Sequence, residues 1–260
     1  MIARWWRRRR DAQLLSRRPI PPALWDATLA RYPFLAALDA EPRARLQTLA
    51  TLFLARKEFP GAGGLEVGDE IAVAVAAQAC LPVLELGLTA YDGFVGIVVH
   101  PDEVVAQREV TDDDGVVHRY EEALAGEAME GGPVMLSWRD VAEAGASAAE
   151  GYNVVIHEFV HVLDMADGML DGMPPLAGAA ARRHWQQVVQ AAHHRLCRTV
   201  EEGRQGFLDP YGAESVEEFF PVAAEAFFVA PLALRDEYPV LYELFAGYFR
   251  QDPATRHAGR

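Results

Sequence analysis

Apolar residues recur with a helical period in two parts of the chain. Between Trp25 and Phe59, Leu46, Leu49 and Phe53 fall on one face of a helix that begins near Glu41. The same period returns after Ser147. It predicts four further helices, at Ala148–Ala166, Ala179–Glu201, Ser215–Ala230 and Tyr238–Arg250.

The stretch between these two parts is richer in β-branched residues, which form short runs bounded by glycine or proline. Two runs, Val104–Val110 and Val116–Tyr120, flank an acidic turn at Asp113, Asp114 and Gly115, a pattern typical of a β-hairpin. The other predicted strands are Gly93–His100, Gly132–Trp138 and Val67–Val75, the last of which runs into a helix at Ala76–Leu86. A proline near the start of Gly132–Trp138 favours an edge position for that strand.

Strands therefore come first and helices follow, which favours an α+β fold over an alternating βαβ arrangement. The chain has 260 residues, of which 51% are hydrophobic, so it can bury a sizeable core. Proline-rich Pro19–Pro22 and glycine-rich Gly61–Gly64 indicate boundaries. We expect a basic N-terminal arm at residues 1–22, a helical segment at 23–64, a main domain at 65–253 and a tail at 254–260.

Composition narrows the classes of function. The net charge of −14 and a pI near 5.0 exclude a broadly basic surface for nucleic acid. Cys80 and Cys197 lie in apolar contexts, and we interpret them as buried free thiols of a protein in a reducing compartment. The arginine-rich start, Trp5–Arg10, precedes no apolar run, so we expect no secretory signal and no membrane span, and we predict a cytoplasmic protein. We interpret this start as a frayed basic terminus; contact with an anionic surface stays open.

Ionisable residues interrupt the apolar run "NVVIHEFVHVLDMADG", which extends from Asn153 to Gly168. His157 and His161 are four residues apart and point the same way on a helix, so both imidazoles can bind one ion. Glu158 stands beside them, where it can take a proton from the water on that ion and pass it to a leaving amine. This is the H-E-x-x-H pattern of zinc peptidases. Burying such groups without a partner costs about several kcal/mol, and Zn²⁺ removes that cost. The alternative is a pair of core histidines paired with a glutamate.

A zinc site needs a third protein ligand. Asp167 is one option, although Asp164 stands where the related longer motif needs a glycine. The helix "ESVEEFFPVAAEAFF" offers four glutamates. Glu225 is the favoured one, because it lies among apolar residues and a carboxylate there needs a cation. Glu218, on the same face, would instead accept a hydrogen bond from a histidine ring, or lie in a solvated helix start. The four candidates are Glu214, Glu217, Glu218 and Glu225.

A tyrosine, an aspartate and a predicted strand near this motif each suggest a role at the site. The phenol of Tyr211 is placed to donate to an oxyanion, or else it packs a helix entry. Asp164 either orients a ligand imidazole or caps the end of the motif helix. An edge strand above the zinc can bind an extended peptide through its backbone, which makes Met135, Leu136 and Ser137 the predicted substrate-binding residues.

Several motifs in this order resemble the Mlc titration factor A family of zinc peptidases: "AAQACLPVLELGL", "GPVMLSW", "HEFVHVLDMADG" and "DPYGAESVEEFFPVAAEAFF". The resemblance runs from about Leu65 to Pro253. It implies a zincin-like, gluzincin-type domain with a small mixed sheet and a mainly helical C-terminal half, similar in its catalytic core to the anthrax lethal factor protease domain. By this resemblance His157, His161 and Glu225 match the zinc ligands, and Glu158 matches the catalytic base.

The expected function is therefore zinc-dependent hydrolysis of peptide bonds by a water that Glu158 activates. A characterised relative in that family shows aminopeptidase activity and binds the glucose repressor Mlc. We therefore take aminopeptidase activity, and a regulatory role through an Mlc-like repressor, as expectations for this chain. The alternative is a non-catalytic, zinc-containing protein that sequesters a regulatory partner. The retained Glu158 argues against it, because a purely structural site has no use for a base.

Overall fold

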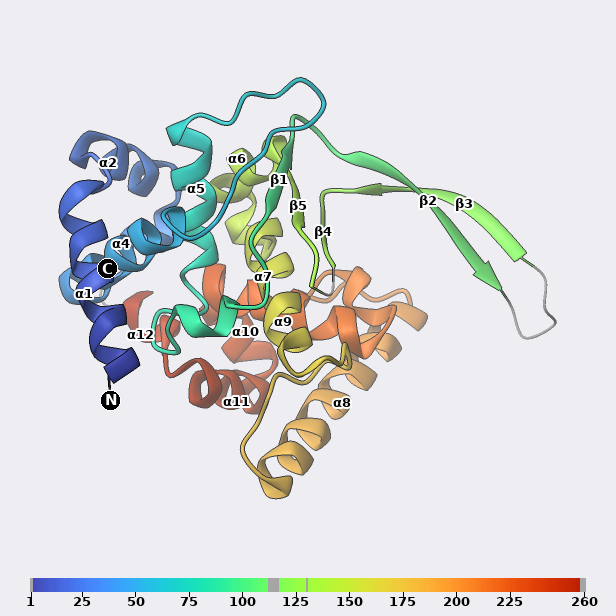
Figure 1. Cartoon of the computed structure of the whole chain (residues 1–260). Helices are drawn as coiled ribbons and strands as arrows, with labels where there is room; N and C mark the ends of the chain where they lie inside the picture. The colour runs from blue at the N-terminus through green and yellow to red at the C-terminus, as the bar shows by residue number, and fades with distance from the viewer. Residues whose placement is uncertain (1, 112–116, 130, 258–260) are drawn as a thin grey trace.

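A computed structural model of the chain describes residues 2–111, 117–129 and 131–257, with side chains for 9–105, 124–129 and 131–256. Helices dominate it (Figure 1). They are α1 (Ile2–Arg17), α2 (Pro22–Arg31), α3 (Pro33–Ala36), α4 (Ala40–Leu54), α5 (Asp69–Ala79), α6 (Trp138–Ser147), α7 (Val154–Asp164), α8 (Ala179–Glu201), α9 (Val216–Val229), α10 (Pro231–Glu237), α11 (Pro239–Phe249) and α12 (Pro253–His257). Four short 3₁₀ helices join them, η1 (Leu88–Tyr91), η2 (Ala148–Glu150), η3 (Met165–Asp167) and η4 (Pro210–Ala213).

The strands form two separate sheets. The first has the order β1-β5-β4, with β1 (Ile97–His100) parallel to β5 (Val134–Ser137) and β5 antiparallel to β4 (Gly126–Ala128). The second is a two-stranded antiparallel hairpin of β2 (Val104–Thr111) and β3 (Val117–Leu124), which projects away from the body of the molecule (Figure 1). A mainly helical chain around a small mixed sheet confirms the predicted α+β, zincin-like class.

The two edges of the three-stranded sheet differ. The segment from Glu58 to Gly61 runs alongside β1 and forms isolated bridges to Gly96 and Val99, so it covers that edge. At the opposite edge lies β4, and among the described residues no strand pairs with its outer side. The sheet therefore offers its open edge at β4.

This order corrects the predicted position of the strand before Trp138. β5 lies in the centre of the sheet, between β1 and β4, so the edge prediction is wrong. The proline that suggested an edge precedes the strand, where it interrupts no ladder. Met135 and Leu136 pair with strands on both sides. Ser137 pairs with His100 of β1 and donates its N–H to the Ala125 carbonyl, so the reason for assigning a peptide to these three residues is lost.

The predicted strand at Val67–Val75 is also wrong. Helix α5 occupies Asp69–Ala79 instead, with Asp69 and Glu70 in its first turn, and eight of its eleven residues are buried. A helix that is apolar on most sides shows little helical period, so its valines give the same sequence pattern as a buried strand. The predicted hairpin is confirmed, but its acidic turn, Asp113–Gly115, lies outside the described residues.

The N-terminal residues are helical rather than frayed. Helix α1 packs Leu14 and Leu15 against the core, and Asp11 pairs with Arg56 at 2.7 Å. One buried apolar cluster extends from Ile20 to Ala254, so the first helices share the core of the rest of the chain. The domain boundaries given above stay a prediction.

The core holds the motif helix α7 by an aromatic cluster. Phe159 of α7 lies edge-on to Phe53 of α4, to Tyr91 and to Phe94, with ring centroids 5.6, 5.1 and 5.7 Å away. Phe159 itself is completely buried. Rotation of α7 would break these contacts, so the cluster fixes which face of the helix points into the core.

Among the described residues, no helix combines the length and the apolar character that crossing a membrane requires.

Candidate metal centre

The first turn of α7 is held by buried hydrogen bonds. The Asn153 side chain accepts from the Ile156 N–H at 2.9 Å and donates to Gln78 of α5 at 2.8 Å, and its backbone N–H donates to Glu225 of α9. An asparagine before an apolar run is a helix N-cap signal. The bonds to α5 and α9 tie the start of the motif helix to two other elements. α7 thus begins at Val154. The residues from Ala148, which were predicted to start this helix, form η2 and a turn at Gly151 instead.

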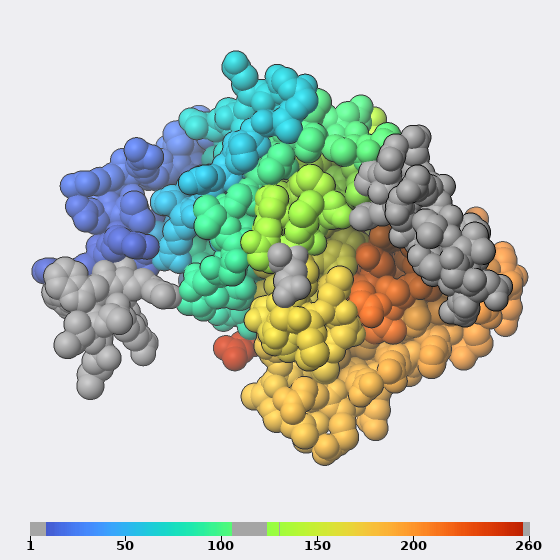
Figure 2. Space-filling model, turned by 45° about the vertical axis from the view of Figure 1, so that its right-hand side comes forward, coloured from blue at the N-terminus to red at the C-terminus, as the bar shows by residue number. Residues whose placement is uncertain are grey.

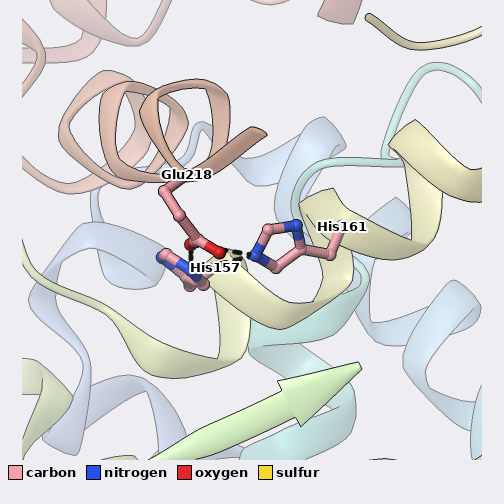
Figure 3. Close-up of side chains that lie close together, drawn as sticks. All are labelled: His157, His161 and Glu218. Atoms are coloured by element: carbon pink, nitrogen blue, oxygen red, sulfur yellow. Dashed lines mark hydrogen bonds and ion pairs between the residues drawn. The ribbon is translucent and has the colours of Figure 1, made fainter. Parts of the chain in front are cut away.

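His157 and His161 face each other across one helical turn, as their spacing predicts. Their Nε2 atoms are 3.2 Å apart, and one oxygen of Glu218 lies 3.2 Å from Nε2 of His157 and 3.3 Å from that of His161. Figure 3 shows Glu218 reaching from α9 to the two rings on α7. These three residues form the one group in the described part of the chain that could hold a metal ion.

The distances suit a zinc ion. Ligand atoms about 2.0–2.1 Å from a tetrahedral Zn²⁺ stand about 3.3–3.4 Å from each other, close to the separations observed here. Two imidazole nitrogens and a carboxylate oxygen that meet at one point need a shared cation or proton. Among the described residues, Nδ1 of His161 is buried and has no hydrogen-bond partner. The donor set therefore fits Zn²⁺.

Glu225 occupies a different place from the one predicted. One of its oxygens lies 2.7 Å from Nδ1 of His157, and the other accepts from the Asn153 N–H. Glu225 thus contacts the back of the His157 ring, while Glu218 meets the nitrogen that faces His161. The sequence predicts Glu225 as the ligand and Glu218 as the outer contact, and which of the two binds a metal stays a prediction. Both glutamates lie on one face of α9, seven residues apart, so sequence spacing does not distinguish them.

His157 and the carboxylates around it change one another's pKa. Burial acts to lower the pKa of His157, but hydrogen bonds to Glu218 and Glu225 raise it well above the ordinary value. Burial likewise acts to raise the pKa of Glu218, whereas its contacts with His157 and His161 hold it well below the ordinary value. Burial raises the pKa of Glu225, against the effect of His157. Carboxylate oxygens thus contact both nitrogens of the His157 ring, an arrangement that suits a bound cation.

Glu158 lies next to this group and under the open strand β4. It is 5% exposed, and burial raises its pKa to about 8, against the effect of His157. A Cβ atom placed on Gly126 of β4 would lie 2.6 Å from Cγ and from Oε1 of Glu158. Only a glycine leaves room for the carboxylate here, and no sequence signal pointed to Gly126.

A cleft of about 180 Å³ opens beside these residues. Leu124, Ala125 and Gly126 line one wall, and the other residues that line it are Tyr152, Val154, His157, Glu158, Asp209, Tyr211, Val222 and Glu225. In Figure 2 the short green strand region, the yellow segment after α7 and the orange segment that leads into α9 adjoin one another at the surface.

Tyr211 stands at the edge of the cleft. Its ring centroid is 6.0 Å from that of His157, and it is 37% exposed. Asp209 caps the η4 turn that carries it by accepting from the Tyr211 N–H at 2.9 Å. The phenol therefore borders the same space as the imidazoles and Glu158.

Asp164 holds the loop after α7. Its oxygens accept from the backbone N–H groups of Gly172 at 2.8 Å, Met173 at 2.9 Å and Asp171 at 3.5 Å, and the residue is completely buried. These bonds go to the loop that follows the helix, and the two roles left open, orienting an imidazole or capping the helix end, stay predictions. The other early candidate, Asp167, is exposed and lies outside the metal-binding group.

We expect Asp164→Ala to lower the free energy of unfolding by about 2–4 kcal/mol, because it leaves backbone N–H groups without their acceptor. Asp167→Ala, the matched control, should change it by less than about 0.5 kcal/mol. Burial raises the pKa of Asp164 from 3.8 to about 6, against the effect of the backbone N–H groups. The protonated form is therefore favoured by folding, and this contribution is present below the unfolded pKa and lost as the pH rises through about 6.

Urea unfolding of both variants between pH 4 and pH 7 checks this. The difference in free energy of unfolding between wild type and Asp164→Ala should shrink as the pH rises. A difference that grows over this range would contradict the assignment.

The chain is similar to known proteins over most of its length. A model of the family described as glucose-regulated metallo-peptidase M90 matches residues 3–250. An uncharacterized protein of Synechocystis is 36% identical over 251 residues, which cover 95% of this chain and 90% of that protein. Mlc titration factor A of Salmonella arizonae is 35% identical over 238 residues, 90% of this chain and 92% of that protein. The protein of the same name from Salmonella gallinarum is 35% identical over 237 residues, 89% and 87% of the two chains.

Proposed function

The chain belongs to the glucose-regulated metallopeptidase M90 family, and from this premise we propose that it is a zinc peptidase whose metal is bound by His157, His161 and Glu218. The convergence of these three side chains on one point carries the proposal. A metallopeptidase-type function and a metal ion follow from the family itself. The identity of the ion as Zn²⁺ and the choice of Glu218 as third ligand are our proposals, supported by the separations of the donor atoms.

Zinc at this point would act as a Lewis acid that polarises a peptide carbonyl and makes a water more acidic. Glu158 takes the proton from the attacking water and delivers it to the departing amine. Its buried position and raised pKa suit a group that both accepts and donates a proton. Tyr211 donates a hydrogen bond to the oxygen on which negative charge develops. Glu225 accepts from Nδ1 of His157, which leaves Nε2 of that ring free for the metal.

The substrate is proposed to be a peptide bound in extended form at the outer side of β4. This strand is the open edge of the sheet, and Gly126 brings its backbone directly over Glu158. An extended peptide can pair with such an edge through its main chain. Binding of this kind selects little by sequence. Removal of one residue at a time from the amino end, as an aminopeptidase does, is the proposed mode of cleavage.

A regulatory partner is a second proposal. Several relatives carry the name Mlc titration factor A. A repressor like Mlc is accordingly a proposed partner of this chain, and a role as a non-catalytic binding protein is the alternative function. We place its action in the cytoplasm, in keeping with Cys80 and Cys197, which are both free thiols.

The proposal is tested by metal content and its removal. Purified protein should contain about one zinc per chain, and His161→Ala should lose it, because two ligands alone bind zinc poorly. Chelation should abolish hydrolysis of a short peptide reporter, and added Zn²⁺ should restore it. His194→Ala, a control at an exposed histidine, should keep both metal and activity. Full hydrolysis by the metal-free protein would rule out the proposal.

Gly126→Ala should lower kcat by about 10²-fold, because the added methyl group displaces the Glu158 carboxylate, and small displacements of a catalytic group are costly. Zinc content and the unfolding midpoint should stay close to wild type, since only the end of a flexible side chain must move. Gly93→Ala is the matched control, because nothing lies within 4 Å of its added Cβ. Steady-state kinetics of wild type, Gly126→Ala and Gly93→Ala provide the measurement. An unchanged kcat in Gly126→Ala would show that this glycine is not needed to place the Glu158 carboxylate.

A further inference from the structure

The β2–β3 hairpin is a structural feature that the proposed mechanism does not use. Its strands pair over eight positions each, from Val104↔Leu124 at the base to Thr111↔Val117 near the tip. At about 3.3 Å per residue the arm is about 26 Å long. It stands clear of the helices in Figure 1.

Both outer edges of the hairpin lack a strand partner among the described residues. An isolated two-stranded hairpin is marginally stable in water, and an unpaired edge is a template for another extended chain. Val105 at its base is 61% exposed, a large fraction for a valine in a strand. A third strand from another polypeptide would satisfy the unpaired backbone groups.

The hairpin is continuous with the cleft. β3 ends at Leu124, and Ala125 alone separates it from β4, which begins at Gly126. These three residues form the wall of the cleft beside Glu158. A polypeptide that lies on this wall therefore reaches the base of the hairpin without crossing a gap.

We infer that the hairpin binds the part of an extended polypeptide substrate that lies beyond the scissile bond, as an added β-strand. This inference rests on the proposed function and narrows its substrate class. The preferred substrate is then a polypeptide long enough to span both the cleft and the arm. A free dipeptide or a single-residue anilide uses the cleft alone.

The test compares the whole chain with a variant in which residues 106–122 are replaced by two glycines, which keeps the base of the hairpin and the cleft wall. One substrate is a single-residue anilide, and the other is an unstructured, internally quenched peptide of about 14 residues, long enough at about 3.3 Å per residue to reach the arm. The variant should hydrolyse the anilide at the wild-type rate and lose at least about tenfold in kcat/KM on the long peptide, as an increase in KM. Equal effects on both substrates, or a gain on the long one, would overturn the inference.

A binding measurement separates this inference from the proposed chemistry. Glu158→Gln with the full hairpin should bind the long peptide, labelled for fluorescence anisotropy, more tightly than Glu158→Gln with the shortened hairpin. N-methylation of alternate backbone nitrogens in the peptide should remove that advantage, because an added strand depends on main-chain N–H groups. Equal affinity for both proteins, or an advantage that survives N-methylation, refutes strand addition. If zinc-loaded wild type hydrolyses neither substrate, the peptidase proposal fails. The comparison of peptide binding with the full and the shortened hairpin would still decide whether the hairpin binds a peptide.

Discussion

Glu158→Gln should reduce hydrolysis of a short peptide reporter by about 10²- to 10⁴-fold, the range that a general acid–base group contributes. Glutamine has nearly the same shape as glutamate, so it should fit beneath Gly126, but it cannot take a proton from water. Zinc content should remain at the wild-type level, because the ligand set is untouched. Kinetics and metal analysis on the same preparation provide the measurement.

The control for this experiment is Glu217→Gln. Glu217 lies in the first turn of α9 beside Glu218, and it is outside the metal-binding group and not among the residues that line the cleft. It should retain full activity. If zinc-loaded Glu158→Gln hydrolyses the reporter as fast as wild type does, the proposal of a zinc peptidase with Glu158 as its base fails. The alternative, a non-catalytic binding protein, would then be favoured.

Glu218→Gln and Glu225→Gln should affect the metal to very different degrees. Loss of the Glu218 carboxylate removes a ligand and its charge, so zinc affinity should fall by more than about 100-fold. Loss of the Glu225 charge weakens the orientation of the His157 ring, and such outer contacts are typically worth about 10- to 100-fold in metal affinity. Competition with a zinc chelator measures both affinities.

This comparison decides between the geometry described here and the assignment suggested by sequence. If Glu225→Gln loses more affinity than Glu218→Gln, then Glu225 is the ligand and the observed arrangement around His157 does not persist with metal bound. Circular dichroism of each variant distinguishes loss of metal from unfolding. Glu217→Gln again provides the baseline, because it changes a carboxylate on the same helix turn.

Sequence was sufficient where a feature depends on local spacing. His157 and His161 meet because residues four apart share a helix face, and α8 has the predicted bounds. The α+β class follows from the order of strands and helices. The hairpin follows from two β-rich runs around a turn.

Sequence was insufficient where long-range packing decides. Glu218 and Glu225 share a face of α9, and which of them reaches Nε2 of His157 depends on how α9 crosses α7. The central place of β5 depends on the three-residue strand β4, which is too short to give a pattern. The role of Gly126 depends on a contact with Glu158, thirty-two positions away in sequence. Each of these outcomes is set by distant parts of the chain.

The aromatic cluster around Phe159 has a practical consequence for anyone seeking a minimal catalytic fragment. A fragment cut to residues 65–253 would begin after α4 and lose Phe53, whose ring lies 5.6 Å from that of Phe159. The residue next to the proposed base would then be open to water on one side. The first helices thus help to hold the motif helix in place. A minimal fragment should therefore begin at or before Ile20, where the shared core begins.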